Sequence, residues 1–169
     1  MATTKSNLIT NEEASPPVLN SVAKQGGRMR VMCDTFEVTQ ADSDTDGDII
    51  RLCRLPSHAV IQSIKLWMDD HGGTATVNCG LYATDADTAT DEDVFATVFD
   101  SGGQVTTGSE LLGEAASATS IASFSKKLYE WLATPLTTDP QIFYDVCLTM
   151  QGVATGAWTC SFIVQYTID

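Results

Sequence analysis

"WTCSFIVQYTI", Trp158 to Ile168, is the stretch of sequence that decides the fold class. Apolar side chains occupy alternate positions along it, and polar side chains fill most of the positions between them. A period of two is typical of a β-strand with one buried face and one face in water. The stretch therefore predicts a strand whose buried face comprises Trp158, Cys160, Phe162, Val164, Tyr166 and Ile168.

The same alternation recurs earlier in the sequence. In "TATVNCGLYA" the odd-numbered residues 75–83 are apolar, and in "QIFYDVCLTM" the even-numbered residues 142–150 are apolar. "HAVIQSIKLWMDD" places Val60, Ile64, Leu66 and Met68 on one face. "GRMRVMCDTFEV" changes parity near Asp34, which predicts a bulge. Turn residues separate these runs, so we expect an all-β chain folded as an antiparallel β-sandwich, specifically a jelly roll.

The flanking segments differ in composition from the predicted strands. Residues 1–27 are polar, without a sustained period, and predict an extended N-terminal arm; residues 28–169 form the predicted sandwich domain. Small residues dominate the stretch 109–133, whose end, Lys126 to Ala133, predicts a short helical insertion before the last two strands. A chain of 169 residues is long enough to bury one core.

Charge is distributed unevenly around a net value of −13. From Leu66 onward there are two lysines against fourteen acidic residues. Because nucleic acids and anionic membranes attract basic proteins, we expect neither as a partner. The N-terminal part is mildly basic and suits an acidic protein surface. Its candidate interface residues are Lys5, Lys24, Arg28 and Arg30.

The five cysteines are widely spaced and include no CxxC pair. This pattern favours reduced thiols in or near strands, although one cross-strand disulfide stays open. No secretory signal or membrane-spanning run is visible, which favours synthesis in a cytoplasm.

"ADSDTDGDII", residues 41–50, is the best candidate for a metal site. Asp42, Asp44, Asp46 and Asp48 alternate there, and Gly47 follows as in a calcium-binding EF-hand loop. The twelfth position of such a loop is Cys53 instead of Glu, and a strand from Ile49 to Leu55 is expected where a helix is needed. The alternative is a solvated turn that requires no cofactor. A second acidic run, residues 85–93, reads as another loop.

Residues for catalysis are few, and we expect no enzymatic activity. His58 directly follows Ser57, and neighbours in an extended chain point to opposite faces, which disfavours a nucleophile and base pair. His71 reads as a turn residue, with a metal-ligand role as the alternative. Trp131 and Trp158 are expected in the core. Trp67 lies opposite the apolar face of its strand and is a candidate interface residue.

The order of the segments resembles a group of tailed-bacteriophage virion proteins similar to capsid decoration, or cement, proteins. The resemblance spans residues 27–169. It is carried by "GDIIRLCRLPSHAVIQSIKLWMDD", "ATVNCGLY", "DVFATVF", "KKLYEWL", "DPQIFYDVCLTM" and "GAWTCSFIVQYTID".

This resemblance implies a non-enzymatic viral structural protein with a sandwich or jelly-roll fold. It would be a homo-oligomer, a dimer or trimer, that binds the outside of a capsid and clamps neighbouring major capsid subunits. Its location would be the virion surface after synthesis in the host cytoplasm. The alternatives are a head fibre or host-binding protein, and a calcium-dependent carbohydrate-binding module.

Overall fold

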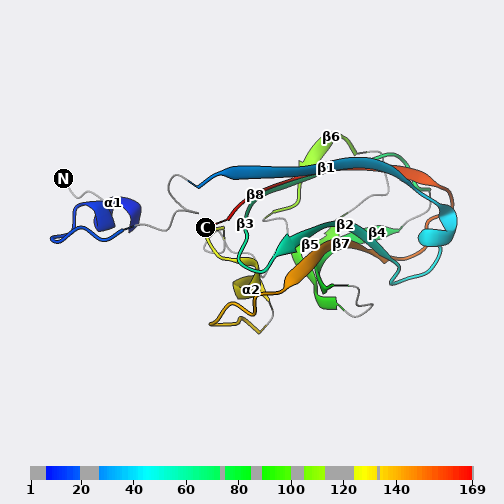
Figure 1. Ribbon diagram of the computed structural model, residues 1–169. Coiled ribbons are helices and arrows are strands. Elements are labelled where there is room, and N and C mark those ends of the chain that lie inside the picture. The colour runs from blue at the N-terminus through cyan, green and yellow to red at the C-terminus, as the bar shows by residue number, and fades with distance from the viewer. Residues whose placement is uncertain are drawn as a thin grey trace.

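The computed structural model describes residues 7–19, 27–72, 75–84, 89–99, 105–112, 124–132 and 134–168. It contains two four-stranded antiparallel sheets that pack face to face (Figure 1), which confirms the predicted all-β sandwich. The strands are β1 (Met29–Val38), β2 (Ile49–Pro56), β3 (Val60–Met68), β4 (Thr76–Ala83), β5 (Ala89–Phe99), β6 (Val105–Glu110), β7 (Phe143–Gln151) and β8 (Trp158–Thr167). The helices are α1 (Asn7–Glu12), the 3₁₀ turn η1 (Gln40–Asp42) and α2 (Leu128–Trp131).

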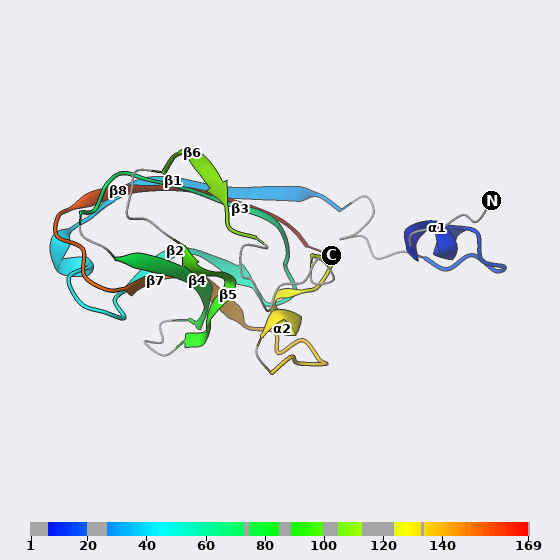
Figure 2. The same cartoon turned by 180° about the vertical axis from the view of Figure 1, so that it is seen from behind.

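The strand order is that of a jelly roll. One sheet has the order β1-β8-β3-β6 and the other β2-β7-β4-β5. Four antiparallel pairs, β1 with β8, β2 with β7, β3 with β6 and β4 with β5, form one long folded ribbon. The β3–β8 and β4–β7 pairings join this ribbon into two sheets. Figure 2 shows both sheets from behind, with α2 at the end of the sandwich where the C-terminus lies.

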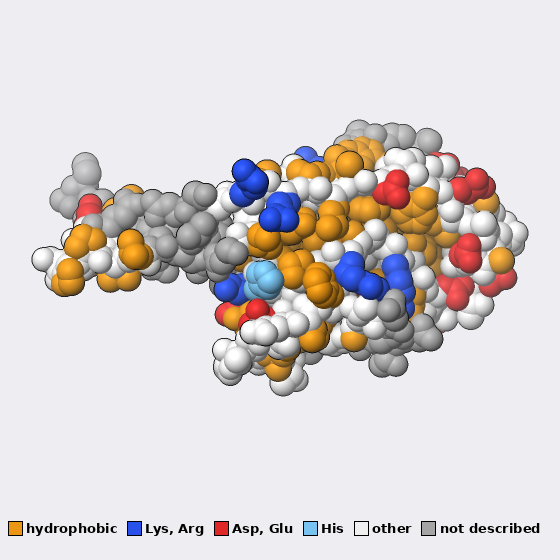
Figure 3. Space-filling model, in the orientation of Figure 1, with side chains coloured by type: hydrophobic (Ala, Val, Ile, Leu, Met, Phe, Trp, Pro, Cys, Tyr) orange, Lys and Arg blue, Asp and Glu red, His pale blue; other side chains and the backbone are white. Residues whose placement is uncertain are grey.

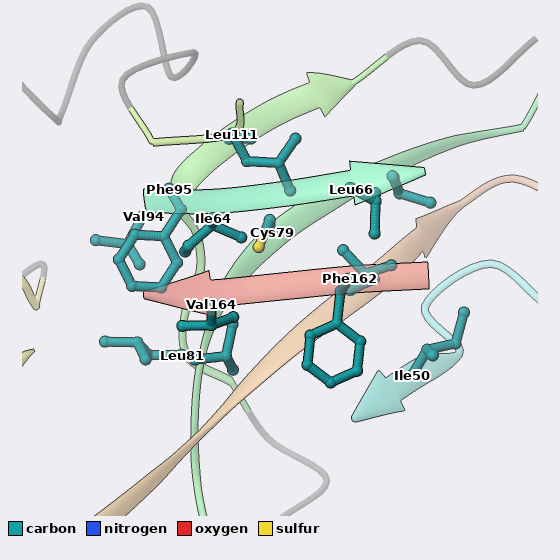
Figure 4. Packing of buried hydrophobic residues seen from close by; sticks show 14 of the residues in the cluster. Ile50, Ile64, Leu66, Cys79, Leu81, Val94, Phe95, Leu111, Phe162 and Val164 are labelled. Atoms are coloured by element: carbon teal, nitrogen blue, oxygen red, sulfur yellow. The ribbon is translucent and has the colours of Figure 1, made fainter. Parts of the chain in front are cut away.

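The core lies between the inner faces of the two sheets (Figure 4). The alternation predicted for β8 is confirmed, because Trp158, Cys160, Phe162, Val164 and Tyr166 are all buried. In Figure 4 Val164 from β8 lies near Leu81 from β4 and Phe95 from β5, and Phe162 lies on the side of Ile50 from β2. These three strands belong to the opposite sheet. Trp131 of α2 also packs against Phe95, with 5.3 Å between ring centroids, so the insertion closes one end of the core.

The predicted bulge near Asp34 is wrong. β1 pairs with β8 in an unbroken register from Met29 to Val38. Asp34 lies opposite Phe162, so it shares the parity of the inner-face residues Met32 and Phe36. It stays exposed because β1 is the edge of its sheet. The change of parity therefore marks an inward-directed charge on an edge strand.

The face assigned to Val60 is also wrong. The register between β3 and β8 shifts between Ile61 and Ser63. Ile61 pairs with the inner-face residue Tyr166, whereas Val60 pairs with Thr167 on the other face. Because a bulge exchanges the two faces of a strand, Ile61 joins the core in place of Val60.

The outer faces of β4 and β7 are not exposed to water as predicted. Asn78, Tyr82, Asp145, Cys147 and Thr149 lie there and are buried, whereas Ile142, expected inside, precedes β7 and is 44% exposed. The backbone of residues 91–92 in β5 lies directly over Gly80. Residues 91–93 therefore belong to a strand and not to an acidic loop, while residues 85–88 fall outside the described part of the chain.

All five cysteines lie in strands and are free thiols. Burial raises the pKa of Cys53, Cys147 and Cys160 to about 12, which keeps these thiols protonated. In the N-terminal segment, where no regular element was predicted, α1 forms a short helix that covers neither sheet in Figures 1 and 2. None of the residues 9–11 and 13–19 belongs to the core cluster.

Candidate functional site

The loops at the two ends of the sandwich differ in chemistry. The β1–β2, β3–β4 and β7–β8 loops meet at one end, which we call the acidic pole. Its exposed or half-buried carboxylates belong to Asp42, Asp44, Asp46, Asp48, Asp69 and Asp70. The sequences of these loops contain no Lys or Arg. Figure 3 shows the acidic side chains gathered at the end that carries η1.

The four aspartates of the predicted calcium loop each accept hydrogen bonds from a different group. Asp46 Oδ1 accepts from the backbone N–H of Gly152 at 2.8 Å, and Asp48 Oδ2 accepts from that of Thr45 at 2.8 Å. Asp42 accepts from the Thr39 hydroxyl at 2.6 Å, and Asp44 accepts from the Thr45 hydroxyl at 3.1 Å. Carboxylates used in this way stabilise turns.

Within the described ranges, no group of three or more His, Cys, Asp or Glu side chains is close enough to hold a metal ion. The loop is instead tied to β7 by two backbone hydrogen bonds, from Gly47 N–H to the Met150 carbonyl and from Met150 N–H to the Asp48 carbonyl, each 2.9 Å long. The turn geometry therefore serves the entry into β2.

His71 lies in the β3–β4 loop, as predicted, but its side chain is buried. The ring packs edge-on against Trp158 with 5.8 Å between centroids, and Nδ1 lies 2.7 Å from the Gly72 carbonyl oxygen. Its carbonyl accepts hydrogen bonds from the backbone N–H groups of Thr155 and Gly156. These contacts give His71 a structural place at the acidic pole.

The opposite end, which we call the apolar pole, carries exposed apolar side chains. Its members come from the start of β1, the surroundings of α2 and the start of β7. They are Met29 at 56%, Val31 at 54%, Phe124 at 37%, Leu136 at 37%, Ile142 at 44% and Phe143 at 53% exposure. Among the described residues of the acidic pole, the large apolar side chain that is exposed belongs to Val153, at 49%. Exposed apolar side chains grouped in this way favour contact with another macromolecule.

A pocket of about 350 Å³ lies within the apolar pole, lined by Pro56, His58, Asp139, Gln141, Ile142 and Phe143. The hydroxyl of buried Ser57 donates to one Asp139 carboxylate oxygen, and Nδ1 of His58 lies 3.6 Å from the other. The Ser57 hydrogen bond lowers the pKa of Asp139 below its ordinary value, and the Gln141 backbone N–H acts in the same direction.

This arrangement does not form a nucleophile and base pair. Asp139 lies between Ser57 and His58, so the serine proton is directed to a carboxylate instead of an imidazole. The Ser57 backbone is used as well, because its N–H donates to the Ile142 carbonyl and its carbonyl accepts from Tyr129. The three side chains fix the β2–β3 turn against the start of β7.

Sequence reasoning missed a charged cluster on the outer face of β2 and β7. Asp145, whose side chain is 3% exposed, accepts from Arg51 at 3.0 Å and from Arg54 Nε at 2.6 Å. Residues three apart in a regular strand face opposite sides. A register shift between Arg51 and Cys53 turns both arginines to the same face. The signal available in the sequence was a charged residue, Asp145, among the apolar residues of an alternating strand.

The predicted interface residues fall in different places. Lys5 and Lys24 lie outside the described residues, and Arg28 and Arg30 are exposed at the start of β1. Trp67 lies on the outer face of β3, as predicted, but is half-buried because its ring packs over Gly108 of β6. The structure thus groups Arg28 and Arg30 with the apolar pole and leaves Trp67 apart from them.

No helix in the described segments is long and apolar enough to cross a membrane. The eight strands in the described part of the chain form a jelly roll with two chemically different poles.

No family model matches the sequence, and no curated protein sequence matches it. The fold, in contrast, matches chains in solved structures. A chain in the capsid of Ralstonia phage GP4 matches at 21% identity and a TM-score of 0.51, over 83% of this chain and 85% of that one. A chain in the cyanophage Pam1 capsid asymmetric unit matches at 17% identity and a TM-score of 0.47, over the whole of both chains. The likeness to the Ralstonia phage chain shows a shared fold.

Proposed function

We propose that this protein is a non-enzymatic structural component of a phage virion that binds the outside of the capsid and clamps neighbouring major capsid subunits. One observation carries the proposal: apolar and acidic surfaces lie at opposite poles of a jelly roll. Its fold is shared with a chain of the Ralstonia phage GP4 capsid, which supports a virion role. The virion surface is its proposed location, after synthesis in the host cytoplasm.

The apolar pole faces the capsid in this proposal. Burial of Phe143 and Ile142 against the capsid lowers the free energy of the complex. The segment before β1 lies at the same end of the sandwich and would extend the contact. Arg28 and Arg30 flank Met29, another member of the apolar pole, and attract acidic groups of the capsid protein. The acidic pole faces solvent, where its charge keeps the particle soluble.

A clamp gains strength from repetition. A closed shell presents the same site many times, and a homo-oligomer that engages two or three subunits converts weak contacts into strong attachment. The protein therefore needs no high-affinity pocket, in keeping with the shallow sites found on the described surface.

Copy number tests the proposal most directly. In purified particles we expect the copy number of this chain to stand in a fixed ratio to that of the major shell protein and to be similar to it. Quantitative mass spectrometry measures both. A few copies per particle would favour a head fibre or host-binding protein, and absence from particles would overturn the virion role. Loss of the protein after a chelator wash would return calcium to the Asp42–Asp48 loop.

Rebinding to particles stripped of the protein tests the apolar pole. Phe143→Asp should weaken binding about tenfold to a hundredfold, because burying a Phe side chain contributes roughly 1.5–3 kcal/mol. Val153→Asp places the same change on a similarly exposed residue at the acidic pole and should leave binding unchanged. The opposite ranking of the two variants would reverse the proposed orientation.

A further inference from the structure

We propose that two copies of this protein pair through their β1 edges, in antiparallel register, with Met32 of each copy on the two-fold axis. β1 runs from Met29 to Val38 and pairs only with β8 among the described strands. The backbone groups on its other side are therefore available to another strand, except that the Thr35 N–H donates to the Asp34 carboxylate at 2.8 Å. This inference is independent of the proposed role in a virion.

The β1 edge is long and exposes apolar side chains. Met29 and Val31 are 56% and 54% exposed, and Cys33 is exposed on the same outer face. An edge of this kind pairs with other strands unless the protein blocks it, and inward-directed charges are a common means of blocking. Arg30 and Asp34 are such charges, because they lie opposite the inner-face residues Tyr166 and Phe162 of β8.

When the partner strand is a second copy of β1, the charges of Arg30 and Asp34 favour pairing instead of preventing it. When two sheets continue into one another about a two-fold axis, each residue faces a residue of the same parity, and the residue on the axis faces its own copy. With Met32 on the axis, Arg30 lies opposite the partner's Asp34. Symmetry forms this opposite-charge pair twice, and directly opposed charges of opposite sign stabilise antiparallel strands.

Neighbouring registers are less favourable. With Asp34 on the axis, the two Asp34 carboxylates face each other, which is destabilising. With Cys33 on the axis, Arg30 faces the partner's Phe36, and Asp34 faces the partner's Met32. With Val31 on the axis, Asp34 faces the partner's Arg28, but the strands overlap only over residues 29–33. Only the register with Met32 on the axis pairs residues 29–35 of the two strands and also places Arg30 opposite the partner's Asp34.

Charge reversal tests the interface in the full-length chain. We expect a dimer by sedimentation equilibrium, and Arg30→Asp or Asp34→Arg should each raise the dimer dissociation constant at least about tenfold. The double variant should restore dimerisation. Lys65→Asp is the matched control, since Lys65 is exposed on β3 in the middle of the same sheet, and it should not change the constant.

Cysteine cross-linking tests the register. Opposed Cα atoms in an antiparallel pair lie about 4.5–5.5 Å apart, within disulfide range, whereas diagonal residues lie roughly 7–8 Å apart. Met32→Cys combined with Cys33→Ser should therefore form a disulfide-linked dimer on mild oxidation. The natural Cys33, diagonal to its copy, should not.

Three results would overturn the proposal. The first is a monomer at the highest soluble concentration. The second is a dimer that tolerates both single charge reversals, or one that the double variant fails to restore. The third is efficient cross-linking through the natural Cys33, which would place Cys33 on the axis. Circular dichroism of each variant, including the partly buried Met32→Cys, checks that the sandwich stays folded.

Discussion

Asp46 shows how this protein uses its acidic residues. Its carboxylate accepts a hydrogen bond from the backbone N–H of Gly152, which lies 106 residues later in the sequence. The spacing of the aspartates resembles a calcium loop, yet each carboxylate has its own partner. The motif reports which residue types are present, whereas chelation depends on whether their oxygens converge on one point.

Asp46→Ala should lower the free energy of unfolding by about 1 kcal/mol in chelator-treated buffer, because it leaves the Gly152 N–H without this acceptor. Asp44→Ala should have little effect, since Asp44 accepts only from the neighbouring Thr45 hydroxyl among the hydrogen bonds described. Urea unfolding measures both. A rise in melting temperature with calcium that both variants abolish would instead show a cation site.

Asp145 has a larger part in stability. It is nearly fully buried and bound by two arginines that remain partly in water. Asp145→Ala should lower the free energy of unfolding by about 2 kcal/mol, below the roughly 3–5 kcal/mol for a fully buried pair, because water can rehydrate the arginines. Asp145→Asn should lose less, since an acceptor oxygen remains. Equal losses in both variants would argue against this account of the charged cluster.

Elements of the fold were predicted where the hydrophobic period is regular. β8 and the inner faces of β4 and β7 follow their alternation, so the sequence is sufficient to place them. Bulges break this rule, as in β2 and β3, because one extra residue exchanges the faces of everything beyond it. The Arg51, Arg54 and Asp145 cluster depends on such a bulge, which is why sequence periodicity did not reveal it.

Gly80→Ala tests the packing of β5 over β4. An added Cβ would overlap the backbone of Asp91 and Glu92, so β5 must move away. We expect a loss of about 1–3 kcal/mol in urea unfolding, with faster amide hydrogen exchange in residues 91–92. Gly47→Ala provides the comparison: its φ of 92° disfavours alanine, but the space around it is open. It should leave exchange in β5 unchanged.

At the scale of the molecule, the N-terminal segment and the sandwich should be separable. Residues 9–11 and 13–19 contribute nothing to the core cluster. A chain restricted to residues 28–169 should therefore unfold cooperatively, with a melting temperature within a few degrees of the full chain in calorimetry. A large fall would mean that the first 27 residues pack on the sandwich. The proposed function further predicts weaker capsid binding by this shortened chain.

The outermost pairing of the ribbon has a consequence during synthesis. Met29 pairs with Thr167, and Val38 pairs with Trp158, so β1 lacks this partner until β8, more than a hundred residues later, has left the ribosome. At about 5–20 residues per second, this delay is on the order of ten seconds. A nascent apolar strand that waits this long depends on chaperones or on its inward charges to avoid wrong pairing. Co-expression of chaperones should therefore raise the yield of soluble protein.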